Sequence, residues 1–136
     1  MLLTLVAVLK HDIIRTGGSL TLTSGMAAVK PGKGAAVGGA LNGGVISLTK
    51  GLASDLSEKK IRVNCVVPGL VQTELWDSMG KTKEQQKEDF EKAAKALPVG
   101  FVSTPQDIAE AYLYCVRADF ATGSLVEISG YSVSFS

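Results

Sequence analysis

The run Ile61-Arg-Val-Asn-Cys-Val-Val67 constrains the fold of this chain more than any other segment. It is almost continuously apolar, and Pro68 and Gly69 end it. A strand without polar alternation is typical of a sheet that is covered on both faces, as parallel sheets flanked by helices are. The run therefore predicts a buried strand over 62–67.

An amphipathic helix is predicted before this strand, because apolar residues recur at steps of four and three over 37–56. The residues on its apolar face are Val37, Leu41, Val45, Leu48, Leu52 and Leu56. Farther upstream, Ser19–Thr23 predicts a short strand that Ser24 and Gly25 close. The apolar start of the chain predicts a buried helix that runs to about Arg15, since the glycine pair that follows suits a helix C-terminus.

Two more helices and a strand are predicted downstream. Lys81–Lys95 is charged and indicates a surface helix, for which Thr82 and Gln85 form a capping box. The cap, first turn and apolar face of a firmer helix are Thr104, Pro105, Asp107, Ile108, Ala111, Tyr112 and Cys115. Ser124–Ser129 predicts the last strand.

Helices and strands thus alternate along the chain. This alternation predicts an α/β fold with a parallel sheet and right-handed crossovers. No repeat or interdomain linker interrupts it, so we expect residues 1–136 to form one domain or part of one.

The charge balance and the cysteines exclude several classes of function. Fourteen basic and thirteen acidic residues leave a net charge of +1 without a basic stripe, so we expect no nucleic-acid partner. The apolar segment 1–9 is too short to span a bilayer and lacks the pattern of a signal peptide, so we expect no membrane association. Cys65 and Cys115 lie in apolar stretches, and we expect buried free thiols in a cytoplasmic protein rather than a disulfide or a metal site.

The order of the motifs resembles the C-terminal half of the short-chain dehydrogenases/reductases. Thr23-Ser24-Gly25 comes first, a glycine- and alanine-rich helix follows, and Ile61–Gly69 with Thr73 completes the match. The resemblance implies a Rossmann-like fold and hydride transfer between NAD or NADP, with NADP slightly preferred, and a carbonyl, alcohol or imine group. It also implies a small-molecule substrate and a homo-oligomer.

The resemblance also assigns roles to residues that follow the first two strands, where ligands bind in open parallel sheets. Ser24 would hydrogen-bond the substrate oxygen, and the segment after the second strand would pack against the nicotinamide ring. That segment contains Pro68, Gly69, Leu70, Val71 and Thr73, while Trp76 and Met79 lie in the segment that covers the substrate in relatives. The alternatives are a Pro-Gly turn that only ends a strand and a serine that only stabilises a turn.

The helix between these motifs departs from the family at two catalytic positions. Relatives carry Tyr-x-x-x-Lys there, but the register of Val45–Lys50 places Gly38 at the Tyr position and Asn42 at the Lys position. The two residues share one helix face. Glycine has no proton to give, and a neutral amide cannot lower a phenol pKa of about 10 through charge. We therefore do not expect the acid–base route that is usual in the family.

The glycines at 38, 39, 43 and 44 each cost this helix up to about 1 kcal/mol relative to alanine. Two explanations are equally good: a ligand fills the space that the Tyr would occupy, or the helix packs closely against another helix, within the chain or across a dimer. Trp76 either stacks on the substrate or, as we favour, anchors its loop to the core. Glu74 and Asp77 are the carboxylates nearest the expected cleft, but each is more typical of a solvated loop; His11 is expected at the surface.

No Gly-x-x-x-Gly-x-Gly loop occurs in the 136 residues. By the resemblance, the family's first strands, pyrophosphate site and catalytic Asn would precede Met1. The strand Ser19–Thr23, interior in a complete sheet, would then have an unpaired edge. We expect a truncated product of a longer parent, with association over this edge as the alternative.

Three functional hypotheses follow. The first is the C-terminal part of an oxidoreductase that uses substitute groups for proton transfer or reduces a substrate needing little acid help, such as an iminium. The second is a non-catalytic binding or scaffold protein, and the third is non-redox chemistry that uses Trp76 and a nearby carboxylate. An Arg or Lys side chain that reaches the space at Gly38 would favour catalysis.

Overall fold

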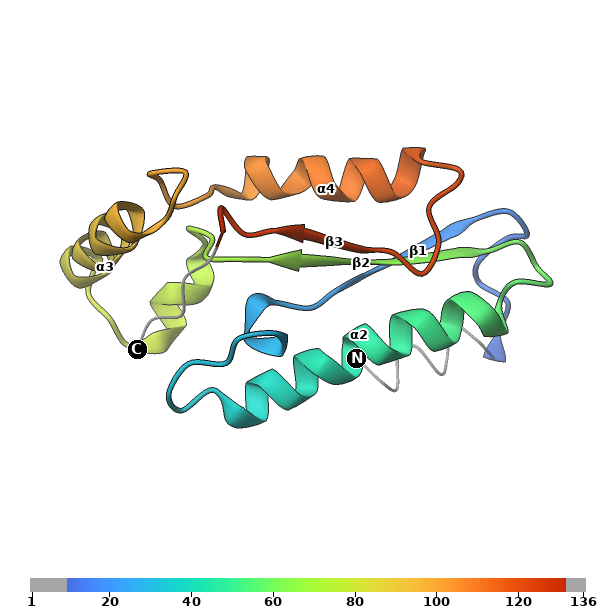
Figure 1. Ribbon diagram of the computed structural model, residues 1–136, viewed down its shortest axis with the longest axis horizontal. Helices are drawn as coiled ribbons and strands as arrows, with labels where there is room; N and C mark the ends of the chain where they lie inside the picture. The colour runs from blue at the N-terminus through green and yellow to red at the C-terminus, as the bar shows by residue number, and fades with distance from the viewer. Residues whose placement is uncertain (1–9, 132–136) are drawn as a thin grey trace.

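Three parallel strands form the middle layer of the chain, with helices on both faces (Figure 1). The computed structural model describes residues 10–131 and, within them, every side chain except that of Met79. The strands are β1 (Ser19–Thr23), β2 (Arg62–Pro68) and β3 (Leu125–Ile128), in the spatial order β1-β2-β3. All pairs are parallel, which confirms the predicted α/β class, and the predicted strand bounds differ from the observed ones by at most one residue.

The central strand β2 is buried on both faces, as its apolar run predicts. Alternate residues Val63, Cys65 and Val67 pack against the helix α2 (Ala36–Asp55), which contributes Val45 and Leu52. Val66 points to the opposite face and packs against α4 (Pro105–Arg117). The α4 face toward the sheet consists of Ile108, Ala111, Cys115 and the half-buried Tyr112, which confirms the predicted face.

The first two turns of α2 correct the predicted apolar face. Val37 and Leu41 are 75% and 67% exposed instead of buried. Here the helix packs against the short 3₁₀ helix η1 (Met26–Ala28) rather than against the strands, and its buried residue is Gly39. The apolar period that the sequence shows over 37–56 is therefore used only from Val45 onward.

The segment before β1 also corrects a prediction. Lys10 is the only helical residue among residues 10–18, and Asp12 takes a left-handed conformation with a φ of 48°. Such a residue ends a helix, so the helix does not continue to Arg15. The rest of that predicted helix, residues 1–9, lies outside the described residues.

Two elements lie beyond the carboxyl ends of the strands. These are the 3₁₀ helix η2 (Glu74–Met79) and the helix α3 (Lys83–Ala96) (Figure 1). The predicted Thr82–Gln85 capping box is present at the start of α3. A small apolar cluster of Ala93, Leu97 and Val102 joins the end of α3 to the chain that leads into α4.

Polar residues of β2 bind the chain around the end of α4. The Arg62 guanidinium donates to the backbone carbonyls of Cys115, at 2.7 Å, and Val116, at 2.8 Å. The Asn64 amide donates to the Ala121 carbonyl at 2.8 Å and accepts from the Ser124 N–H at 3.1 Å. These interactions explain the two polar residues in an otherwise apolar strand. Within residues 10–131, no helix has both the length and the hydropathy needed to cross a membrane.

Candidate functional site

A cleft of about 750 Å³ lies at the carboxyl ends of β1 and β2. It brings together most of the residues that the sequence singled out. Among its lining residues are Ser24, Asn42, Pro68, Gly69, Thr73 and Trp76, and the predicted Leu70 and Val71 belong to it as well. Gly38 does not line it, and the side chain of Met79 lies outside the described part of the chain.

Ser24 is buried, and its hydroxyl already has a hydrogen-bond acceptor. The Oγ donates to the backbone carbonyl of Asn42 at 2.9 Å, and the Ser24 N–H donates to the Val66 carbonyl at 2.9 Å. A hydroxyl has one hydrogen to donate and two lone pairs to accept with. In this arrangement Ser24 can accept a hydrogen bond from a ligand, but it can donate to a ligand only after it leaves the Asn42 carbonyl.

The Asn42 side chain lies beside Gly25 at the wall of the cleft. A Cβ at Gly25 would approach Asn42 Nδ2 to 3.3 Å, so the glycine leaves room for this amide. The side-chain amide of Asn42, unlike its backbone carbonyl, makes no hydrogen bond to another residue in the range 10–131. The amide therefore retains both its donor and its acceptor for a ligand.

The glycines of α2 are in different surroundings. A Cβ at Gly39 would lie 2.7 Å from the Ala27 carbonyl oxygen and 3.2 Å from Pro31 Cβ, so close packing within the chain explains this glycine. Apart from their chain neighbours and the nearby backbone of α2 itself, no described atom lies within 4 Å of a Cβ position at Gly38, Gly43 or Gly44. The space at Gly38 is open, and no Arg or Lys among the described residues reaches it.

The opposite wall of the cleft begins at the end of β2. Gly69 donates its N–H to the Ile128 carbonyl at 3.0 Å, and a Cβ at Gly69 would lie 2.8 Å from the Ser129 Cα. The chain just after β3 therefore requires a glycine at this position. Val71 continues this wall and forms an isolated bridge with Ser103.

Trp76 is fastened at both ends of its ring system. Its Nε1–H donates to the Val71 carbonyl at 2.7 Å, and its ring meets the Phe90 ring edge to face at 5.6 Å between centroids. These contacts support the anchoring interpretation. Because Trp76 also lines the cleft, its emission can report on a bound ligand.

The carboxylates after β2 do not line the cleft. Hydrogen bonds from Lys83 and Gln86 hold the pKa of Asp77 below its ordinary value, and Asp77 is not among the lining residues. Glu74 is exposed and does not line the cleft, and His11 is an exposed residue of the turn before β1. Within residues 10–131 no cluster of three or more His, Cys, Asp or Glu side chains is placed to hold a metal ion.

One charged residue of the cleft was missed by sequence reasoning. Lys30, two residues after η1, is the only charged residue among those described that lines it. No motif or periodicity marks this position, because it lies in an irregular connection between β1 and α2.

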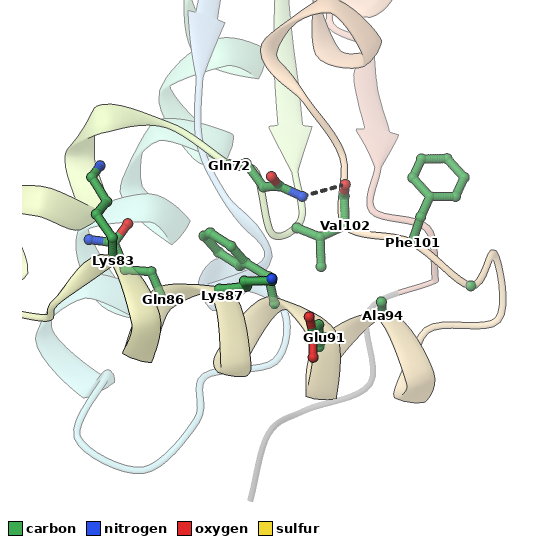
Figure 2. A pocket seen from close by; sticks show the side chains of 10 residues that line it. Gln72, Lys83, Gln86, Lys87, Glu91, Ala94, Phe101 and Val102 are labelled. Carbon is green, nitrogen blue, oxygen red and sulfur yellow. Dashed lines mark hydrogen bonds between the residues drawn. The ribbon is translucent and has the colours of Figure 1, made fainter.

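A second, smaller pocket of about 400 Å³ lies between α3 and residues 100–102 (Figure 2). Lys83, Lys87 and Glu91 follow one side of α3 there, and Gln72 donates to the Val102 carbonyl at 3.3 Å. It shares no lining residue with the cleft. The sequence did not predict this pocket.

The fold agrees with comparisons against known proteins. A family model described as enoyl-(acyl carrier protein) reductase matches residues 2–130. The chain belongs to the short-chain dehydrogenase/reductase family. The crystal structure of a small-chain dehydrogenase in complex with NADPH matches with a TM-score of 0.84 and 35% identity, over 92% of this chain and 56% of that one.

Curated members of the short-chain dehydrogenase/reductase family are longer than this chain. The 3-oxoacyl-[acyl-carrier-protein] reductase of Rattus norvegicus is 30% identical over 120 residues, which are 88% of this chain and 47% of the relative. Short-chain dehydrogenase/reductase malC of Malbranchea aurantiaca is 39% identical over 112 residues, which are 82% and 40%. The chain thus spans about half the length of the curated relatives that it matches.

Proposed function

We propose that this chain supplies the substrate side and the nicotinamide side of a short-chain dehydrogenase/reductase that uses NAD(P)(H) and has a divergent active site. Its substrate would carry a carbonyl, alcohol or imine group. The observation that carries the proposal is the cleft at the strand ends, which gathers Ser24, Asn42 and the 68–73 segment on two facing walls. Residues 1–136 would form one partial NAD(P)-binding domain.

The lining residues fit the nicotinamide end of such a cofactor, which supplies a hydride when bound. The wall from Pro68 to Val71 is largely apolar, and Thr73 adds a hydroxyl beside it. A flat, weakly polar ring suits such a wall. The solved relative in complex with NADPH supports NADP over NAD. The glycine-rich loop that cradles a pyrophosphate is not found in these 136 residues, so the proposal for this chain covers the nicotinamide end only.

Proton transfer is the step for which the cleft is least equipped. Gly38 offers no side chain, Asn42 offers a neutral amide, and the Ser24 proton is directed at the Asn42 carbonyl. A carbonyl needs a proton as it gains a hydride, whereas an iminium does not, because the incoming electron pair neutralises its nitrogen. These residues therefore favour an iminium, which they would bind and orient without an acid.

The same three residues also support the alternative, a non-catalytic binding or scaffold protein. Use of Trp76 with a nearby carboxylate is not supported, because neither Glu74 nor Asp77 lines the cleft. For either function we propose a cytoplasmic homo-oligomer. The exposed Val37 and Leu41 support the association, and the buried free thiols suit a reducing compartment.

A titration of the purified, folded chain with NADPH and then NADH tests the cofactor. Trp76 is the only tryptophan, so saturable quenching of its emission is the expected result. Thr73→Ala should weaken the quenching, whereas Thr16→Ala, an exposed substitution away from the cleft, should not. A folded chain whose emission does not respond to either nucleotide contradicts the proposal.

The divergent chemistry needs a separate assay. We expect NADPH to be consumed with the N-methyl-1-piperideinium ion but not with cyclohexanone, a matched six-membered substrate that requires a proton. Reduction of the ketone at a comparable rate would show that an acid operates in the site. Saturable NADPH binding without turnover of any iminium would favour the scaffold alternative.

A further inference from the structure

The cleft carries an unbalanced positive charge. Lys30 is the only charged residue among its described lining residues, and the remaining walls are apolar or neutral. No salt bridge joins Lys30 to an acidic residue within 10–131. Because no lining carboxylate balances this ammonium, a ligand with an anionic group would supply the missing charge.

The backbone of Lys30 is held at the edge of the cleft. Its N–H donates to the Met26 carbonyl at 2.8 Å, which continues the turn of η1. The turn itself rests on α2, where Gly39 is in contact with the Ala27 carbonyl. Packing therefore fixes the position of the Lys30 backbone, whereas the residue as a whole is exposed to solvent. Folding pays little desolvation penalty for an exposed ammonium, because the charged group keeps its hydration in the unliganded chain.

We propose that Lys30 makes the cleft selective for substrates in which an anionic group, a carboxylate or a phosphate, is attached to an apolar body. In an iminium substrate this anionic group would also offset the repulsion between the iminium cation and the ammonium. The apolar wall formed by Leu70, Val71 and Trp76 would take the body, and the ammonium would take the anion. The inference rests on the proposed function only in treating the cleft as the substrate site. A phosphate of the cofactor has the same chemistry, and the experiment separates the two sources.

The test uses cyclohexanecarboxylate and cyclohexanecarboxamide, which have nearly the same shape and differ in charge. Both are transparent where tryptophan is excited, so Trp76 emission reports their binding at low ionic strength. The wild-type chain should bind the acid about three- to tenfold more tightly than the amide. Lys30→Met should reduce this ratio to about one, and added salt should reduce it in the wild type. Lys33→Met is the matched control, because Lys33 does not line the cleft and its loss should leave the ratio unchanged.

Three results would overturn the inference. The first is a wild-type chain that binds neither probe or binds both equally, and the second is an acid preference that survives in Lys30→Met. The third is a Lys30→Met chain that binds NADPH more weakly while its acid-to-amide ratio stays that of the wild type, which would assign Lys30 to the cofactor. An acid preference that depends on Lys30 in a chain that does not bind NADPH would support the inference and contradict only the proposed function.

Discussion

Asn64 is a fully buried polar residue in the central strand, and it joins two segments far apart in the sequence. Its amide nitrogen donates to Ala121, and its amide oxygen accepts from Ser124. Both groups belong to the turn between α4 and β3, so one side chain fixes where β3 begins beside β2. A buried amide that satisfies two backbone groups is costly to remove, because those groups cannot turn to water.

Asn64→Ala should lower the free energy of unfolding by about 2–4 kcal/mol, because it leaves the Ala121 carbonyl and the Ser124 N–H without partners. Urea denaturation measures the change. Asn42→Ala is the control, since the Asn42 amide makes no hydrogen bond to a described residue and alanine is the better helix former. Equal losses in the two variants would refute the role given to Asn64.

At the scale of elements, one glycine joins α2 to η1 and so shapes the near wall of the cleft. The Ala27 carbonyl occupies the space where a side chain at position 39 would lie. The neighbouring Gly38 has the same helical backbone and open space instead. The two positions therefore separate the packing effect of a methyl group from its effect on helix propensity.

Gly39→Ala should destabilise the chain by about 1–3 kcal/mol through overpacking against η1. Gly38→Ala should stabilise it by up to about 1 kcal/mol, because alanine restricts the unfolded chain and favours the helix. Thermal and urea unfolding of both variants check the two signs. A stabilising Gly39→Ala would mean that η1 does not rest on this glycine.

What could be predicted from the sequence depends on whether a feature is set by a local pattern or by packing between elements. The strands, α3 and α4 could be predicted because their patterns are local: apolar runs for the strands, a capping box for α3 and an apolar face at helical spacing for α4. The exposure of Val37 and Leu41 could not, because it depends on where η1 packs. Lys30 and the bond from Ser24 to the Asn42 carbonyl were missed for a related reason, since both depend on how an irregular connection meets a helix. The motifs located the cleft, but not the charge within it.

For the whole molecule, the free energy of unfolding should fall at both low and high pH. At acid pH three carboxyl groups matter, because hydrogen bonds hold their pKa values below the ordinary 3.8. Lys83 donates to Asp77, Lys81 donates to Asp89, and the Thr104 N–H donates to Asp107. On the alkaline side, burial raises the pKa of the Cys65 and Cys115 thiols above their ordinary 9.0.

The acid limb follows from the sign of these shifts. A carboxyl whose pKa is lowered by folding stabilises the native state above the unfolded pKa, and this contribution is lost as pH falls through the folded pKa. The free energy of unfolding should therefore be level near pH 6 and fall below about pH 4. Urea titrations at a series of pH values measure it. The double variant Asp77→Asn with Asp89→Asn should fall less steeply, and an unchanged slope would count against these two carboxylates.

The alkaline limb has the opposite sign. A thiol whose pKa is raised by folding contributes stability below the unfolded pKa, and the contribution is lost as pH rises above about 9. Both thiols are fully buried, so they should react with a disulfide reagent at pH 8 only as fast as the chain opens. Fast reaction of either thiol in the native chain, without urea, would contradict this expectation.

The two walls of the cleft are fastened to different supports. The near wall is tied to α2 through Ser24, and the far wall is tied to the chain just before α4. There the Ser103 hydroxyl donates to the Leu70 carbonyl at 2.7 Å, and the Gln72 N–H donates to the Ser103 backbone carbonyl at 2.9 Å. The sheet lies between these two supports and therefore sets the distance between the two walls of the cleft. Substitutions deep in the interior, such as larger or smaller side chains on β2, would change that spacing without altering any residue that meets a ligand. Substitutions in the core can therefore change which ligands fit the cleft, even where every residue that contacts a ligand is kept.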